Sequence, residues 1–287
     1  MTSRPPDWRL NRFAAEMERL RGTMTKEKVK DETGISPVTL WRIENGERHP
    51  KESTVIPLLN LFGASPQERE HVMALWRDAE KHDLPGEDDY AAALRDGYNA
   101  YMWIERQAIG LWNYQTAFVP GLFQTEAYVR AIIAGMWPDA TPEEVQQHVD
   151  ARMRRQTLLT KPDPLQLAAV VDEAALRRWV GGPEVMAEQM RKLQATAALP
   201  HVSLQVIPNA AGAHAGMPGG FASLTFPGAT EPEIVYLESP ASDQFLQKKD
   251  QVEPYTATFE SVRRKALPPA ESLAFIASVE CDYKEAA

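Results

Sequence analysis

A short stretch at residues 36–50, SPVTLWRIENGERHP, carries side chains that could contact the edges of DNA bases. Its composition predicts a helix over 37–45. The Ser36 hydroxyl can accept a hydrogen bond from the first turn, and Pro37 fits the first helical position, where an N–H would have no partner in any case. Gly46 can end the helix in a left-handed conformation. The proline therefore marks the start of a helix and does not interrupt one.

The predicted helix has a buried side and an outward side. Leu40 and Ile43 lie three positions apart, so they should pack inward together. The outward side chains are then Pro37, Val38, Thr39 and Arg42. In a helix that enters the major groove, Arg42 could bond O6 and N7 of a guanine, and Val38 or the Thr39 methyl group could contact a thymine methyl. The alternative is an ordinary solvated surface helix.

Another predicted helix, over 26–33, precedes this one and is separated from it by Gly34-Ile35-Ser36. A tight turn with a glycine at positive φ sets two helices at a steep angle, as in a helix-turn-helix motif. Lys26 at the start of the earlier helix and Arg48 beyond the later one would lie near phosphates. The full set of predicted DNA contacts is Lys26, Ser36, Pro37, Val38, Thr39, Arg42, Asn45 and Arg48.

The stretch TKEKVKDETGISPVTLWRIENGERHP, residues 25–50, resembles the Xre/Cro-type helix-turn-helix family. The shared pattern is Gly-hydrophobic-Ser before the recognition helix and Glu-Asn-Gly-x-Arg-x-Pro after it. The resemblance implies that Glu44 forms a structural ion pair with an arginine of the first helix, which here would be Arg19. The sequence departs from the family at Val29-Lys30, where Leu-Ala is usual.

The distribution of charge along the chain separates two regions. The chain has 287 residues, 44% of them apolar, which is enough for two domains with cores of their own. Residues 1–82 hold 14 Lys/Arg and 13 Asp/Glu, a net charge of 14 − 13 = +1, whereas the remaining residues hold 17 and 27, a net charge of 17 − 27 = −10. The overall charge of −9 therefore does not argue against a nucleic-acid partner for the first region.

The expected location of the chain is the cytoplasm, in association with the nucleoid. The sequence has no apolar run of bilayer length, and its N-terminal stretch lacks the apolar segment of a signal peptide. Cys281 is the single cysteine, so no internal disulfide can form, which fits a reducing compartment.

The expected fold class is α+β, with an all-α helix-turn-helix domain at 1–83, a linker at 84–94 and a mixed regulatory domain at 95–287. Helices of the first domain are expected at 8–21, 26–33, 37–45, 52–62 and 66–81. Helices of the second domain are expected at 91–106, 123–135, 142–160, 183–197, 250–265 and 269–279. Strands are expected at 165–171, 202–208, 221–226 and 233–238. The last three strands follow one another through short loops, which predicts an antiparallel meander.

The second domain resembles the C-terminal domain of a group of actinobacterial Xre-type regulators, the WhiJ-like or antitoxin-like regulators. The similar segments are 118–135, 170–193, 202–227 and 234–239. The resemblance implies a regulator of development or antibiotic production, whose C-terminal domain has no established catalytic role. It also implies a small partner protein encoded by a neighbouring gene.

Two segments of the second domain are candidate sites for a ligand or partner. In VPGLFQTEAYVRAI, residues 119–132, Gln124 and Thr125 could face a pocket, although the alternative is a purely structural turn into a helix. In the glycine-rich segment at 212–221, His214 could contact a ligand from a mobile loop. No helix with Lys-Ser/Thr follows that segment, so it does not fit a phosphate-binding loop.

No metal site, cofactor or catalytic centre is expected. The histidines show no paired spacing and there is one cysteine, so ligands for zinc are lacking. No Gly-x-Ser-x-Gly turn or similar constellation for nucleophilic catalysis is present. An enzyme with an accessory DNA-binding domain is therefore the least supported interpretation.

The sequence predicts a sequence-specific transcriptional regulator. A single helix-turn-helix contacts few base pairs, so we expect a homodimer on palindromic double-stranded DNA with half-sites about 34 Å apart or a multiple of that. The alternatives are an antitoxin-like interaction module that acts through its small partner protein, or a repressor that senses a small molecule.

Overall fold

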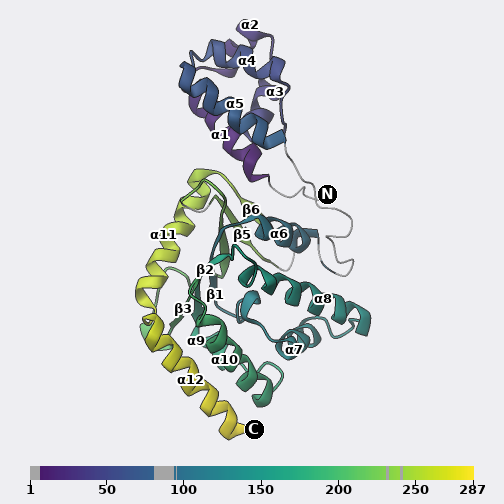
Figure 1. Cartoon of the computed structure of the whole chain (residues 1–287), viewed down its shortest axis with the longest axis vertical. Coiled ribbons are helices and arrows are strands. Elements are labelled where there is room, and N and C mark those ends of the chain that lie inside the picture. The colour runs from purple at the N-terminus through teal and green to yellow at the C-terminus, as the bar shows by residue number, and fades with distance from the viewer. Residues whose placement is uncertain (1–6, 81–93, 95, 231–232, 240–241) are drawn as a thin grey trace. The chain divides into compact units, whose positions relative to one another are not determined.

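The computed structural model describes residues 7–80, 94, 96–230, 233–239 and 242–287 (Figure 1). The chain divides into two compact units, one within Pro6–Leu84 and one that comprises most of Pro85–Ala287, and each is described by itself. The predicted linker at 84–94 lies outside the described residues, except for Leu94. Every helix in the described part of the chain is too short or too polar to cross a bilayer.

The first unit consists of five helices within residues 7–80. They are α1 (Trp8–Arg21), α2 (Lys26–Thr33), α3 (Pro37–Glu44), α4 (Glu52–Leu61) and α5 (Pro66–Glu80). Short polar caps start the first three, since Asp7, Thr25 and Ser36 each accept backbone N–H groups of the turn that follows. All five predicted helices are confirmed, each within one residue of its predicted end.

The core of the first unit is one cluster to which every helix contributes. Its fully buried side chains include Phe13, Met17, Val29, Leu40, Ile43, Val55, Leu58 and Val72. Full burial of a side chain of this size contributes about 1.5–3 kcal/mol, so the cluster fixes the orientation of α3 relative to its neighbours. The outward side of α3 is thereby held in one direction.

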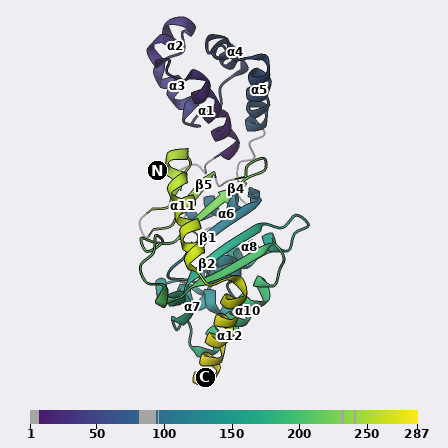
Figure 2. The ribbon, with the colours of Figure 1, turned by 90° about the vertical axis from the view of Figure 1, so that its left-hand side faces the viewer.

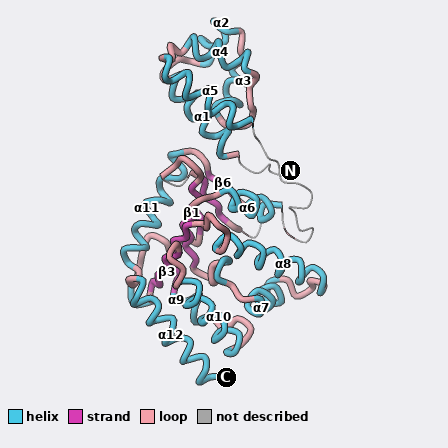
Figure 3. Tube along the Cα trace, in the orientation of Figure 1, coloured by secondary structure: helices cyan, strands magenta, loops and turns pink. Residues whose placement is uncertain are grey.

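The second unit is built on a mixed six-stranded sheet with the strand order β3-β2-β1-β4-β5-β6. The strands are β1 (Gly110–Gln115), β2 (Gln166–Asp172), β3 (Val202–Ile207), β4 (Phe221–Thr225), β5 (Ile234–Leu237) and β6 (Gln244–Leu246). β1 pairs with β2, and β2 with β3, in parallel, whereas β1 with β4, β4 with β5, and β5 with β6 pair antiparallel. Figure 3 shows the strands lying between helices.

The predicted meander of 202–208, 221–226 and 233–238 is wrong in its first strand. The antiparallel meander consists of β4, β5 and β6, and β3 lies at the opposite edge of the sheet. The reason is the connection, because β3 is reached from β2 through the helices α9 (Glu173–Arg177) and α10 (Pro183–Ala197). A strand that returns through helices pairs in parallel with the strand it left, so β3 joins β2.

Helices cover both faces of this sheet. On one face, α11 (Lys249–Lys265) crosses the strands (Figure 2). Trp112 of β1 stacks on Phe259 of this helix, with ring centroids 5.1 Å apart. On the other face, Tyr101 of α6 (Asp96–Gln107) stacks on Tyr236 of β5 at 4.3 Å. The remaining helices are α7 (Glu126–Met136), α8 (Pro142–Arg155) and α12 (Pro269–Ala286). Short 3₁₀ turns occupy Gly121–Phe123, Gln156–Leu159 and Asn209–Ala211.

Candidate functional site

The turn between α2 and α3 has the geometry of a helix-turn-helix. Gly34 ends α2 in the left-handed region, with φ 73° and ψ 0°, and its N–H donates to the Lys30 carbonyl at 2.8 Å. Ser36 starts α3, because its Oγ accepts the Thr39 N–H at 3.2 Å. Ile35 between them is half-buried and packs against the core of the unit. The turn therefore forms as predicted.

The two sides of α3 differ in exposure as the sequence predicts. Leu40 and Ile43 are fully buried, whereas Val38 is 61% exposed. Arg42 is exposed, and its guanidinium makes no hydrogen bond or ion pair within the described residues. Ser36 is also exposed, and Pro37 and Thr39 are partly exposed. α3 thus presents an arginine beside small apolar groups, the combination that can contact base edges.

The predicted ion pair between Glu44 and Arg19 is wrong. Glu44 is buried, and its Oε1 accepts a hydrogen bond from Nε of Arg21, while the Lys26 ammonium lies 2.9 Å from its Oε2. Two residues along a helix correspond to a rotation of about 200°, so Arg19 and Arg21 point to nearly opposite sides of α1. Only Arg21 points towards α3.

Arg19 instead connects α1 to α5. Its guanidinium donates to Glu16 and, at 2.9 Å, to Glu68. The hydrogen bond from Arg19, together with those from Ser65, lowers the pKa of the Glu68 carboxyl to about 2. Arg19 is thus a surface connection between two helices of the unit.

Three other predicted DNA contacts lie in different environments. The Lys26 ammonium is engaged by Glu44, so it is not free within the domain. The Asn45 side chain turns back on its own helix and donates to the Trp41 carbonyl at 2.8 Å. Arg48 is exposed beyond the end of α3 and has no partner within the described residues. The structure therefore brings Arg42 and Arg48 to solvent and uses the other two internally.

The cap of α3 gives a first testable effect. Replacing Ser36 by alanine removes the acceptor for the Thr39 N–H, and we expect the first unit to lose about 1 kcal/mol of stability. Thermal unfolding of the purified chain measures the loss. Ser53→Ala, at an exposed position in the first turn of α4, is the control and should leave the midpoint unchanged. Equal midpoints for both variants would contradict the role of the cap.

In the second unit, Gln124 and Thr125 are buried and serve the packing of α7. Thr125 caps this helix, with its Oγ1 accepting the Tyr128 N–H at 3.2 Å and its own N–H donating to Gln189 at 2.8 Å. Gln124 donates to the Val119 carbonyl at 2.7 Å. Neither residue lines the cavity that α6 and α8 border in this unit. The structural alternative for this segment thus accounts for their contacts.

His214 is half-buried in the glycine-rich segment and contacts its own loop and the sheet. Its Nδ1 accepts the Gly216 N–H at 3.2 Å, and its Nε2 lies 3.8 Å from the Asp172 carboxylate. Its ring meets Tyr114 edge-on, with centroids 6.1 Å apart. The structure does not bring His214 together with Gln124 and Thr125 at the cavity.

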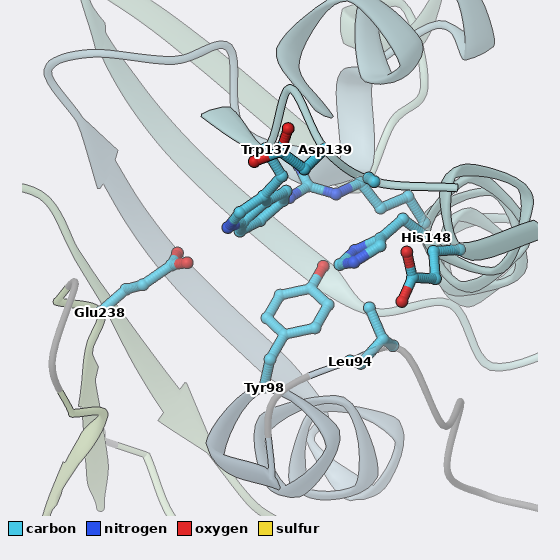
Figure 4. A pocket seen from close by; sticks show the side chains of 9 residues that line it. Leu94, Tyr98, Trp137, Asp139, His148 and Glu238 are labelled. Atoms are coloured by element: carbon cyan, nitrogen blue, oxygen red, sulfur yellow. The ribbon is translucent and has the colours of Figure 1, made fainter. Parts of the chain in front are cut away.

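The cavity has a volume of about 320 Å³ and is lined by α6, α8, the loop after α7 and the end of β5 (Figure 4). Three of its side chains, Glu144, His148 and Arg152, are spaced four residues apart and form one stripe along α8. The other lining residues are Leu94, Tyr98, Trp137, Asp139, Ala140 and Glu238. This site was not predicted from the sequence, although the four-residue spacing of Glu144, His148 and Arg152 on α8 was a signal for it.

A buried ion pair lies behind Tyr98 of this cavity. Arg155 donates to both carboxylate oxygens of Glu105, at 2.6 and 2.8 Å, and also bonds the Tyr98 hydroxyl. The Tyr101 hydroxyl donates to Glu105 at 2.8 Å. Burial by itself would lower the pKa of Arg155, but Glu105 beside it holds that pKa above its usual value. Burial, and then the charge of Glu105, raise the pKa of Tyr101.

No group of three or more His, Cys, Asp or Glu residues converges in the part of the chain that the structure describes. The candidate binding surfaces are the outward side of α3 and the cavity beside α8.

Comparison with known protein families agrees with the division of the chain into two units. A family described as a helix-turn-helix domain matches residues 12–72, which contain most of α1 and all of α2, α3 and α4. This match indicates a DNA-binding regulator. A domain of unknown function (DUF5753) matches residues 98–278, more than half of the chain. The searches of curated proteins and of solved structures gave no match. The chain therefore belongs to the family defined by this domain of unknown function and carries it after an N-terminal helix-turn-helix domain.

Proposed function

We propose that the chain is a sequence-specific transcriptional regulator of the Xre/Cro type that inserts α3 into the major groove of DNA. The observation that supports this proposal is that α3 has one buried side and one exposed side. Leu40 and Ile43 hold the helix in the core, while the Arg42 guanidinium is exposed and unpaired within the described residues. A guanidinium in this state can bond O6 and N7 of guanine with both arms.

The regulator acts on DNA as a homodimer in this proposal. An eight-residue helix reads only a few base pairs, which is too few for selection of one site in a genome. Two copies related by a two-fold axis would contact a palindromic operator with half-sites about 34 Å apart or a multiple of that. The second unit, which resembles the C-terminal domain of the WhiJ-like regulators, would control the dimer by binding and not by catalysis. Its signal would be a small partner protein or a small molecule.

Substitution of Arg42 tests the proposal. DNA bound by the purified protein is first sequenced to define an operator, and affinities for operator and for shuffled DNA are then measured at one salt concentration. We expect Arg42→Ala to weaken operator binding about 10- to 100-fold, because one bidentate contact with guanine discriminates by about 1–3 kcal/mol. Binding to shuffled DNA should weaken by about threefold or less, since it depends on total charge.

Arg77→Ala is the matched control for this experiment. Arg77 is exposed on α5, so its substitution removes the same charge from a different helix. We expect it to change both affinities alike and only slightly. An equal loss of operator and shuffled DNA binding by Arg42→Ala would show that Arg42 contacts phosphate and reads no base.

A further inference from the structure

The outward side of α3 carries an exposed tryptophan. Trp41 is 45% exposed, although tryptophan side chains are on average highly buried. Within the described residues its indole stacks on no other ring, and its Nε1–H has no hydrogen-bond partner. Leu40 and Ile43 already fill the core on the inner side of the helix. The packing of the first unit therefore does not account for an indole at this position.

Val38 and Trp41 form one apolar strip along α3. They are three residues apart, so they lie on adjacent turns of the same side of the helix, and Val38 is 61% exposed. Asn45, one turn further on, does not interrupt the strip, because its side chain donates to the Trp41 carbonyl. Arg42, whose guanidinium is unpaired within the described residues, lies beside the strip.

The major groove of DNA offers one apolar group that such a strip can cover, the C5 methyl group of thymine. Contact between the strip and this methyl group removes water from both surfaces. Burial of one methyl-sized group strengthens binding by about fourfold. An indole is large and rigid, so it gives this contact at a low cost in side-chain entropy.

We propose that Trp41 is a specificity-determining residue, which contacts the methyl group of a thymine beside the guanine that Arg42 bonds. One residue advances a helix by about 1.5 Å, less than half of the roughly 3.4 Å between base pairs, so the two side chains reach neighbouring base pairs. The operator half-site would then contain thymine next to guanine. This inference rests on the proposed function and extends base reading from Arg42 to a second residue.

The test removes the thymine methyl groups one at a time. The operator is defined by sequencing the DNA that the full chain binds, and each thymine of one half-site is then replaced by deoxyuridine, which lacks the methyl group and keeps every hydrogen-bonding group. The guanine bonded by Arg42 is located as the base whose replacement no longer matters in Arg42→Ala. We expect deoxyuridine beside that guanine to weaken binding by the unaltered chain about fourfold.

Three variants assign the contact to its residue. Trp41→Ala should weaken operator binding about tenfold and abolish the effect of deoxyuridine beside the guanine, because two groups in contact lose their effects together. Trp41→Phe is the matched control, since it keeps an aromatic ring without the N–H, and should retain that effect. Val38→Ala should also retain it, because Val38 would cover a different methyl group.

Two results would overturn the inference. The first is an unaltered chain that binds the deoxyuridine operator as tightly as the thymine operator, a measurement that does not depend on whether Trp41→Ala folds. The second is an equal loss of operator and shuffled DNA binding in both Trp41→Ala and Trp41→Phe, which would mean that the indole N–H bonds a phosphate. A chain that selects no DNA sequence would refute the proposed function and this inference together. If Arg42 reads a guanine and deoxyuridine has no effect, this inference alone is refuted.

Discussion

Replacing Glu105 by glutamine is expected to lower the free energy of unfolding of the second unit by about 3–5 kcal/mol, because it leaves a buried arginine without a counter-ion. Glu105 is fully buried and Arg155 nearly so. Both carboxylate oxygens accept hydrogen bonds from Arg155, so the amide nitrogen of glutamine would point one donor at another. Hydrogen exchange of the β1 and β2 amides in urea measures the loss in this unit alone.

A double replacement distinguishes the cost of an unpaired buried charge from the cost of altered packing. Glu105→Leu combined with Arg155→Met removes both charges, and we expect it to cost less than Glu105→Gln, because an apolar pair needs no hydrogen bonds. The control is Glu126→Gln, which breaks the solvent-exposed pair with Arg130 at 2.6 Å and should cost about 0.5 kcal/mol or less. A loss for Glu105→Gln no larger than for this control would refute the buried ion pair.

The helices of the first unit could be predicted because their signals are local. Thr25 and Ser36 start helices by accepting N–H groups within three residues, and Gly34 ends one through its own backbone angles. The side of α3 that faces the core follows from the spacing of its apolar residues. The pair of Glu44 with Arg21 is different, because it depends on how α1 is rotated relative to α3, which no local signal gives.

The sheet of the second unit could be predicted only in part, because strand order depends on contacts between distant segments. Four strands were predicted near their observed places, but the short edge strand β6 and the central strand β1 were not. This strand, GLWNYQ, has Asn113 buried in the middle of the sheet, so it lacks the apolar pattern of a central strand. β1 joins the parallel strands to the antiparallel half of the sheet, and without it the short loop after 202–208 predicted a direct pairing with 221–226.

The cavity could not be predicted either, because it is formed by segments that are distant in the sequence. Its stripe of Glu144, His148 and Arg152 lies on one helix, but the stripe lines a cavity only because Trp137 stacks beside it and Tyr98 faces it from α6. Gln124 and Thr125, by contrast, were predicted as ligand contacts because they lie in a distinctive motif. In the structure, Thr125 caps α7 and Gln124 donates to the Val119 carbonyl. A motif in a single sequence does not show whether its residues serve packing or ligand binding.

Replacing Glu44 by alanine is expected to lower the free energy of unfolding of the first unit by about 3 kcal/mol, because it leaves Arg21 and Lys26 without the buried carboxylate that they share. Small domains are stable by roughly 0.05–0.15 kcal/mol per residue, so this is a large part of the total for a unit of this size. Since Glu44 ends the recognition helix, operator binding should fall with the folded fraction. Hydrogen exchange of the α3 amides measures the change.

The controls for Glu44 also test which arginine is its partner. Glu47→Ala, at an exposed position three residues further on, should change stability by about 0.5 kcal/mol or less. Arg21→Ala should destabilise the unit more than Arg19→Ala, because Arg21 lies against the buried carboxylate whereas Arg19 contacts carboxylates at the surface. The reverse order would restore the pairing expected from the family resemblance. It would also mean that α1 is rotated differently against α3, which would change the side that the recognition helix presents to DNA.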